Sequence, residues 1–265
     1  MTHESHESYV LSNDEPTAGS MLDCLSSILD DVTGARLAAA GVAGGARCLE
    51  VGAGNGSIAI WLADRVGPAG RVDATDKQPR HVRAYPRVTV LDHDVANEPL
   101  PAGPYDIIHA RLLLAHLPER DEVLGKLAGA LSPGGALVVE EWGAGPGRVL
   151  STPDPEIAEL YARYQEALLA VFRSAGNDTG WSARVHSAMV DIGLVDVETT
   201  VQARSWIGGS PGCLLPVLVS YELRDRLIGA GINGDELDRL RAALVDPRVV
   251  LLGNLTWSTT GRRAR

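Results

Sequence analysis

Three glycines alternate with other residues at Gly52, Gly54 and Gly56, directly after an apolar run that carries a single acid, Glu50. Apolar residues then recur at helical spacing over 58–66, so the pattern predicts a buried strand, a tight turn and a helix. Glycines let the backbone turn sharply and let a ligand approach closely. The turn also leaves N–H groups at a helix N-terminus, which favours a polar or anionic group. The chemistry that this stretch predicts is ligand binding.

A second acid stands where a nucleotide-binding unit would place one. Residues 71–76 predict a second strand that ends in Asp76, 20 residues after Gly56. An acid at the end of the second strand of such a unit accepts hydrogen bonds from ribose hydroxyls. The alternative is a helix N-cap or turn acid, but the position and spacing favour the ribose role. Residues 88–91 predict a third strand, and Asp94 follows it.

The composition argues against several kinds of partner. The chain has 265 residues and a net charge of −10, and its only basic cluster lies at 262–265, whereas a nucleic-acid groove needs a concentrated basic face. No apolar run reaches membrane-spanning length, and the first residues do not resemble a signal peptide. The three cysteines form no C-x-x-C pair. We therefore expect a cytoplasmic protein without nucleic-acid, membrane or metal partners; a homodimer is possible.

The spacing of the glycines identifies a family. The third glycine comes one residue too early for the dinucleotide fingerprint G-x-G-x-x-G. The stretch 49–56, Leu-Glu-Val-Gly-Ala-Gly-Asn-Gly, instead resembles the first motif of class I S-adenosylmethionine (SAM) dependent methyltransferases, in which the acid stands two residues before the first glycine. The resemblance covers residues 45–142, includes a Pro-Gly-Gly turn at 133–135, and is closest to small-molecule enzymes of bacterial natural-product pathways.

The resemblance implies SAM as the cofactor and assigns residues to it. The glycine turn would hold the methionine part, Asp94 would meet the exocyclic amine of adenine, and Val95 would line the adenine pocket. The implied cofactor-binding residues are Glu50, Gly52, Ala53, Gly54, Asn55, Gly56, Asp76, Lys77, Asp94, Val95, Ala110 and Arg111.

The order of elements predicts an α/β fold. Strands and helices alternate, which specifies a parallel sheet with helices on both faces. The resemblance implies a Rossmann-like sheet of seven strands, mostly parallel with the last antiparallel, and with helical lid insertions. We expect one structural domain with three parts: a helical cap over 1–44, a SAM-binding core over 45–143, and lid helices with the remaining strands over 144–265. Gly34 is expected to interrupt the cap helix, and single strands are expected over 195–206 and 249–259.

Two residues after the fourth predicted strand, 105–110, are candidates for catalysis. Arg111 could reach the SAM carboxylate or an acidic acceptor, because ligands lie outside the carboxyl ends of strands in open α/β sheets; a surface ion pair is an equal alternative. Some related O-methyltransferases carry a catalytic histidine nine positions after the strand aspartate. That position here is Ala115, and His116 comes one residue later, so a hydrogen-bonded loop histidine is the alternative interpretation.

Aromatic residues are few, and several gather after the fifth predicted strand, 136–140. Some of them are expected to be plain core residues, but a lid lined with aromatics suits a flat, mostly apolar small molecule. The candidate acceptor-binding residues are Trp142, Tyr161, Tyr164 and Phe172.

The sequence and the resemblance therefore predict a methyltransferase that transfers a methyl group to an O, N or C atom of a small-molecule acceptor in secondary metabolism. Three alternatives remain open: a SAM-binding scaffold without transfer, a SAM-assisted cyclase, and an NAD-dependent oxidoreductase, for which the glycine spacing is wrong.

Overall fold

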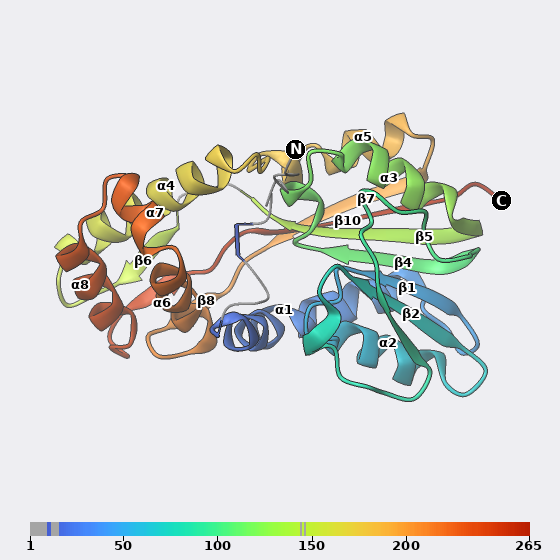
Figure 1. Ribbon diagram of the computed structural model, residues 1–265, viewed down its shortest axis with the longest axis horizontal. Helices are drawn as coiled ribbons and strands as arrows, with labels where there is room; N and C mark the ends of the chain where they lie inside the picture. Colours follow the sequence, from blue (N-terminus) through green and yellow to red (C-terminus); the bar gives the residue numbers. More distant parts are fainter. Residues whose placement is uncertain (1–9, 12–15, 144, 146) are drawn as a thin grey trace, which may run out of the picture.

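A seven-stranded sheet is the centre of the computed structural model, which describes residues 10–11, 16–143, 145 and 147–265 (Figure 1). The strand order is β3-β2-β1-β4-β5-β10-β7. The first five strands are parallel, and β10 runs antiparallel to both β5 and β7. The predicted sheet is confirmed. Its strands are β1 (Arg47–Val51), β2 (Arg71–Asp76), β3 (Val88–Asp92), β4 (Tyr105–Arg111), β5 (Leu131–Trp142), β7 (Val195–Gln202) and β10 (Thr256–Arg262).

Helices cover both faces of this sheet (Figure 1). On one face, α1 (Ala18–Ala40) and α2 (Ser57–Val66) bury apolar side chains against β1, β2, β4 and β5. On the other face, α3 (Arg120–Gly129) and α5 (Val185–Asp191) do the same. Two short turns of 3₁₀ helix, η2 (Leu114–His116) and η3 (Trp181–Ala183), lie on the side of α3 and α5 and contact each other.

A second apolar core lies beside the sheet, at the left of Figure 1. A three-stranded sheet in the order β6-β9-β8 joins four helices there. The N-terminal half of α1 also packs into this core, through Met21 and Cys24, while its C-terminal half packs on the large sheet. The elements are β6 (Arg148–Ser151), β8 (Ser205–Ile207), β9 (Val250–Leu252), α4 (Glu156–Ser174), α6 (Pro211–Glu222), α7 (Arg224–Gly229) and α8 (Gly234–Leu244).

The structure corrects two of the predicted strands. The stretch 195–206 divides into β7 and β8, and the stretch 249–259 divides into β9 and β10. Both divisions have the same cause, because the two antiparallel segments leave the large sheet together and continue into the small one. Gly253 N donates to the carbonyl of Arg204 (2.8 Å) between the two sheets, which keeps the segments paired through the crossing. Alternating apolar residues cannot show to which sheet a strand belongs.

The structure also corrects the cap helix, which continues through Gly34 without interruption. The glycine is required by packing against α2: a Cβ atom at Gly34 would lie 2.9 Å from Nε1 of Trp61.

Within the described residues, no helix combines the length and apolar character needed to cross a bilayer.

The close contact between Gly34 and Trp61 predicts opposite effects for two glycine-to-alanine changes inside helices. Alanine gains about 0.5–1 kcal/mol over glycine in a helix interior. Gly125→Ala in α3 should realise this gain, since nothing lies within 4 Å of the added Cβ. Gly34→Ala should instead destabilise the protein by about 1 kcal/mol, because overpacking against Trp61 outweighs the gain. Urea unfolding of both variants measures this; a G34A protein as stable as G125A would contradict the packing argument.

Candidate functional site

The glycine turn joins β1 to α2 at the carboxyl edge of the parallel strands. Gly52, Gly54 and Gly56 have φ angles of 72°, 57° and 81°, in the left-handed region that side chains disfavour. The N–H groups of Gly52 and Ala53 donate to the carbonyl of Thr75, at 2.8 and 3.0 Å. The tight turn that the glycine spacing predicted is confirmed, and these two hydrogen bonds also fix it to the end of β2.

The carboxylate of Asp76 lies directly against this turn. Its Oδ2 accepts from Gly54 N at 2.9 Å, and its Oδ1 accepts from Gln78 N at 2.8 Å. The side chain is half-buried at the end of β2. The structure therefore brings the second predicted acid to the first predicted motif.

Asp94 and Lys77 form an ion pair near the end of β3, with Lys77 Nζ 3.2 Å from Asp94 Oδ2. Burial acts to raise the pKa of Asp94, but hydrogen bonds from Asn97 and Lys77 outweigh it and lower the pKa. Val95 follows as a buried side chain. The carboxylate of Asp94 is ionised at neutral pH and partly open to solvent, as an acceptor for an amine must be.

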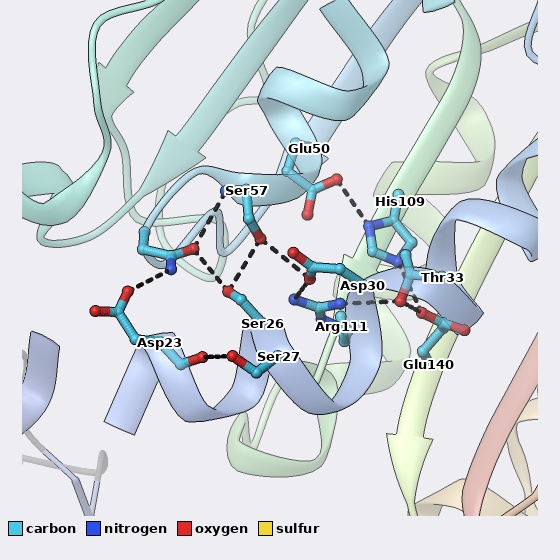
Figure 2. Close-up of polar contacts among 11 residues, drawn as sticks. Asp23, Ser26, Ser27, Asp30, Thr33, Glu50, Ser57, His109, Arg111 and Glu140 are labelled. Atoms are coloured by element: carbon cyan, nitrogen blue, oxygen red, sulfur yellow. Dashed lines mark hydrogen bonds and ion pairs between the residues drawn. The ribbon is translucent and has the colours of Figure 1, made fainter. Parts of the chain in front are cut away.

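The neighbouring strand β4 adds Ala110, His109 and Arg111. Ala110 pairs in register with Val51, the residue that precedes Gly52. His109 pairs in register with Glu50, and its ring lies buried between two carboxylates (Figure 2). Nδ1 donates to Glu50 Oε2 at 2.7 Å, and Nε2 points at Glu140 Oε2 at 3.4 Å.

The charges in this buried group compensate one another. Burial lowers the pKa of His109, but the Coulomb attraction of Glu50 and the hydrogen bonds to both carboxylates raise it to about 9. Burial acts to raise the pKa of Glu140, but His109, Ser258 and Thr33 outweigh it, so the pKa is lowered overall. His109 is therefore an imidazolium at neutral pH, with both ring nitrogens as donors. The sequence showed only that His109 is a strand residue; the register of β1, β4 and β5 was needed to find its partners.

Helix α1 lies over the glycine turn and supplies polar partners that the sequence analysis missed (Figure 2). Arg111 donates through Nη1 to Thr33 Oγ1 at 2.9 Å and through Nη2 to Asp30 Oδ1 at 3.0 Å. The Thr33 hydroxyl in turn donates to Glu140. Further contacts tie α1 to the turn itself: Asn55 to Asp23, Ser26 to Asn55 and Ser57, and Ser57 to Asp30.

His116 lies at the end of η2, where its side chain is half-buried. Burial lowers its pKa to about 4, although a contact with Asn177 acts in the opposite direction. Its ring packs edge-on against Phe172, with centroids 5.9 Å apart. A base with so low a pKa accepts protons weakly at neutral pH, so a catalytic role for His116 stays a prediction that this conformation does not favour.

The other aromatic candidates lie in different places. Tyr161 and Tyr164 are buried in the helical core, and the Tyr164 hydroxyl donates to the carbonyl of Pro216. Trp142, at the end of β5, packs beside Trp206 and donates to Thr256 Oγ1 at 3.1 Å. Contact of these residues with an acceptor stays a prediction.

The buried imidazolium predicts a pH dependence of stability. The pKa of His109 is raised from 6.5 to about 9 by folding. The stabilisation from its proton is therefore complete below pH 6.5 and is lost as the pH rises through 9. Unfolding free energies should fall between pH 7 and 9 in the natural protein and in the control His186→Gln, which changes an exposed histidine. In His109→Gln this decline should be flattened. An unchanged decline in H109Q would show that another group causes it.

Comparison with known proteins gives this geometry a context. A family model described as a methyltransferase domain matches residues 28–177. Methyltransferase str2 of Strobilurus tenacellus is 33% identical over 135 residues, which are 50% of this chain and 48% of the relative. Nocamycin O-methyltransferase of Saccharothrix syringae is 29% identical over 171 residues, 58% of this chain and 60% of the relative. The chain thus spans only about half the length of the curated relatives it matches.

Solved structures share the fold. Phosphoethanolamine N-methyltransferase 2 of Haemonchus contortus, solved with S-adenosyl-L-methionine, has a TM-score of 0.59 at 15% identity, covering 98% of this chain and 60% of that one. The YcgJ protein of Bacillus subtilis has a TM-score of 0.54 at 12% identity, covering 89% and 99%. At such identities the likeness concerns the fold alone. The family match, however, spans more than half of the chain and includes the glycine turn and Asp76, so the chain belongs to the SAM-dependent methyltransferases of class I.

Proposed function

We propose that this protein transfers the methyl group of SAM to an O, N or C atom of a small-molecule acceptor in secondary metabolism. The observation that carries the proposal is the meeting of the glycine turn with the carboxylate of Asp76 at the carboxyl edge of the sheet. The acceptor class is supported by relatives that are named for small molecules, such as nocamycin O-methyltransferase. The net charge of −10 argues in the same direction, because it would repel nucleic acid.

The described residues fit the cofactor. Each carboxylate oxygen can accept two hydrogen bonds, and the protein uses one at each oxygen of Asp76, which leaves capacity for a ribose diol. Asp94, ionised and partly exposed, suits the exocyclic amine of adenine, and the buried Val95 beside it suits the ring. The left-handed turn at Gly52, Gly54 and Gly56 gives the amino-acid end of SAM a backbone without side chains. Lys77 would act through its ion pair with Asp94.

The protein's own contribution to the reaction is positioning. Bound SAM supplies an already activated methyl group, so orientation and exclusion of water can account for much of the rate. Helix α1 lies over the turn and would shield the cofactor from solvent. A guanidinium offers hydrogen-bond donors and no acceptor, so we assign Arg111 to binding rather than to proton abstraction. We keep His116 as the proposed base only for a conformation in which its ring reaches the acceptor.

The test follows the methyl group. The protein is incubated with methyl-labelled SAM and an extract of the source organism, and label is measured in small-molecule, protein and RNA fractions. We expect label in the small-molecule fraction, and none with Asp76→Ala protein. Label in protein or RNA would overturn the acceptor class. Binding of SAM without label in any fraction would favour a scaffold or a SAM-assisted cyclase.

The ribose contact gives a sharper prediction. Asp76→Asn keeps one oxygen for Gly54 N–H but removes the charge, and hydrogen bonds to charged groups contribute about 1.5–3 kcal/mol. The dissociation constant for S-adenosylhomocysteine (SAH) should therefore rise about tenfold or more, as measured by calorimetry. The matched control is Asp92→Asn, an exposed carboxylate that pairs in register with Asp76 on β3. Equal effects of the two changes would contradict the ribose role.

A further inference from the structure

The ion pair between Arg111 and Asp30 is an incomplete one. Arginine and a carboxylate commonly form two parallel hydrogen bonds. Here Asp30 contributes only Oδ1, at 3.0 Å from Nη2, and the same oxygen also accepts from Ser57 Oγ at 3.1 Å. The Arg111 side chain is 13% exposed, whereas that of Asp30 is 32% exposed. The guanidinium is thus fixed in the interior, while its carboxylate partner comes from the rim, on a separate helix.

The charges around this pair match the amino-acid end of the cofactor. That end carries one carboxylate and one ammonium group. Arg111 follows Ala110 on β4, directly beside the strand that leads into the glycine turn. Figure 2 shows the second carboxylate oxygen of Glu50 turned away from His109, toward the side where Asp30 and Arg111 lie. An anion and a cation therefore face the same side of the turn, the arrangement that a zwitterion requires.

The carboxylate of Glu50, which is the anion on this side of the turn, is held in place by buried partners. His109 binds the other oxygen of Glu50 at 2.7 Å, and Glu140 lies on the far side of the imidazole ring. The cation is held in place as well, because Arg111 also donates to Thr33, whose hydroxyl donates to Glu140. Arg111 and Glu50 belong to one hydrogen-bonded chain, Asp30–Arg111–Thr33–Glu140–His109–Glu50, in which the Thr33 hydroxyl links Arg111 to Glu140. Asp30 stands at the more exposed end of this chain, so it is the member that a ligand carboxylate could replace.

We propose that Asp30 occupies the place on Arg111 that the α-carboxylate of the cofactor takes, so that cofactor binding exchanges one carboxylate for the other and releases this contact of α1. Asp30 would then act as a built-in competitor that weakens cofactor affinity and helps to expel the product SAH by recapturing Arg111. The contacts of Asp23 and Ser26 with the turn do not involve Arg111, so α1 can shift without leaving the site. The inference rests on SAM as the cofactor of the proposed function.

The test compares two ligands that differ only in the contested group: SAH and its decarboxylated analogue, which keeps the amine. Dissociation constants are measured by calorimetry for the natural protein, for Asp30→Asn, and for Asp31→Asn. The last is a control with the same change of charge on the next, exposed residue of α1. We expect D30N to bind SAH about five- to tenfold more tightly, and D31N to be unchanged. The analogue should bind the natural protein and D30N with the same affinity.

Two results would overturn the exchange. Tighter binding of both ligands by D30N would mean that Asp30 opposes closure in general, and weaker binding of SAH would make Asp30 a structural tie. A melting curve accompanies each variant, and Arg111→Gln gives a second route if D30N does not fold: it should weaken SAH binding far more than binding of the analogue, and equal losses would refute the proposal. Failure of the natural protein to bind either ligand would reject SAM itself, which separates that outcome from failure of the exchange.

Discussion

The site depends on a protonated histidine held between two carboxylates inside the sheet. An unpaired ion in a protein interior is costly, and removal of one partner from a buried pair commonly costs about 3–5 kcal/mol. Glu50, His109 and Glu140 come from the adjacent strands β1, β4 and β5, so the imidazolium lies between its two carboxylates only if these strands pair in the observed register. A slip by one residue would turn the three side chains to opposite faces. The buried charges thus specify the register of the strands whose ends form the candidate cofactor site.

The same charges determine where α1 lies. Thr33 and Arg111 carry the network from Glu140 to the helix, and Asp30 completes it near the rim. Helix α1 also packs into both apolar cores, through Met21 at one end and Leu37 at the other. Apolar packing therefore fixes the helix along its length, while the polar network fixes its rotation over the glycine turn. The apolar packing at both ends would keep the helix at the site during the proposed exchange of its Asp30 contact.

Much of the fold was predictable because its signals are local. The glycine turn, the strand ending at Asp76 and the alternation of strands and helices each depend on neighbouring residues. The missed features depend on distant ones. Gly34 looked like a helix break because the reason for a glycine there is distant in the sequence. The indole of Trp61, 27 positions away, lies where a side chain at position 34 would have to be. The division of 195–206 could not be seen, because alternation of apolar residues is the same in either sheet.

The site was predictable to a similar degree. The residues of the first motif and Asp76 come together as expected, because each follows a strand at the same edge. The contribution of α1 was missed, since Asp23, Ser26 and Asp30 look like the polar side of an amphipathic helix. His109 was identified only as a strand residue, because its partners lie 59 and 31 residues away. Tyr161 and Tyr164 show the opposite limit: their helical spacing suited a lid surface and a core equally well, and the structure places them in a core.

The position of β10 has a consequence for how the protein is made. This strand follows all the other described strands in the chain, yet it lies between β5 and β7 and brings Ser258 to the carboxylate of Glu140. During translation the ribosome releases β1, β4 and β5 well before β10 exists. Until then β5 is an edge strand, open to pairing with other nascent chains. The complete network around Glu140 can therefore form only after β10 has been released, and the preceding intermediate is the species that a chaperone would need to protect.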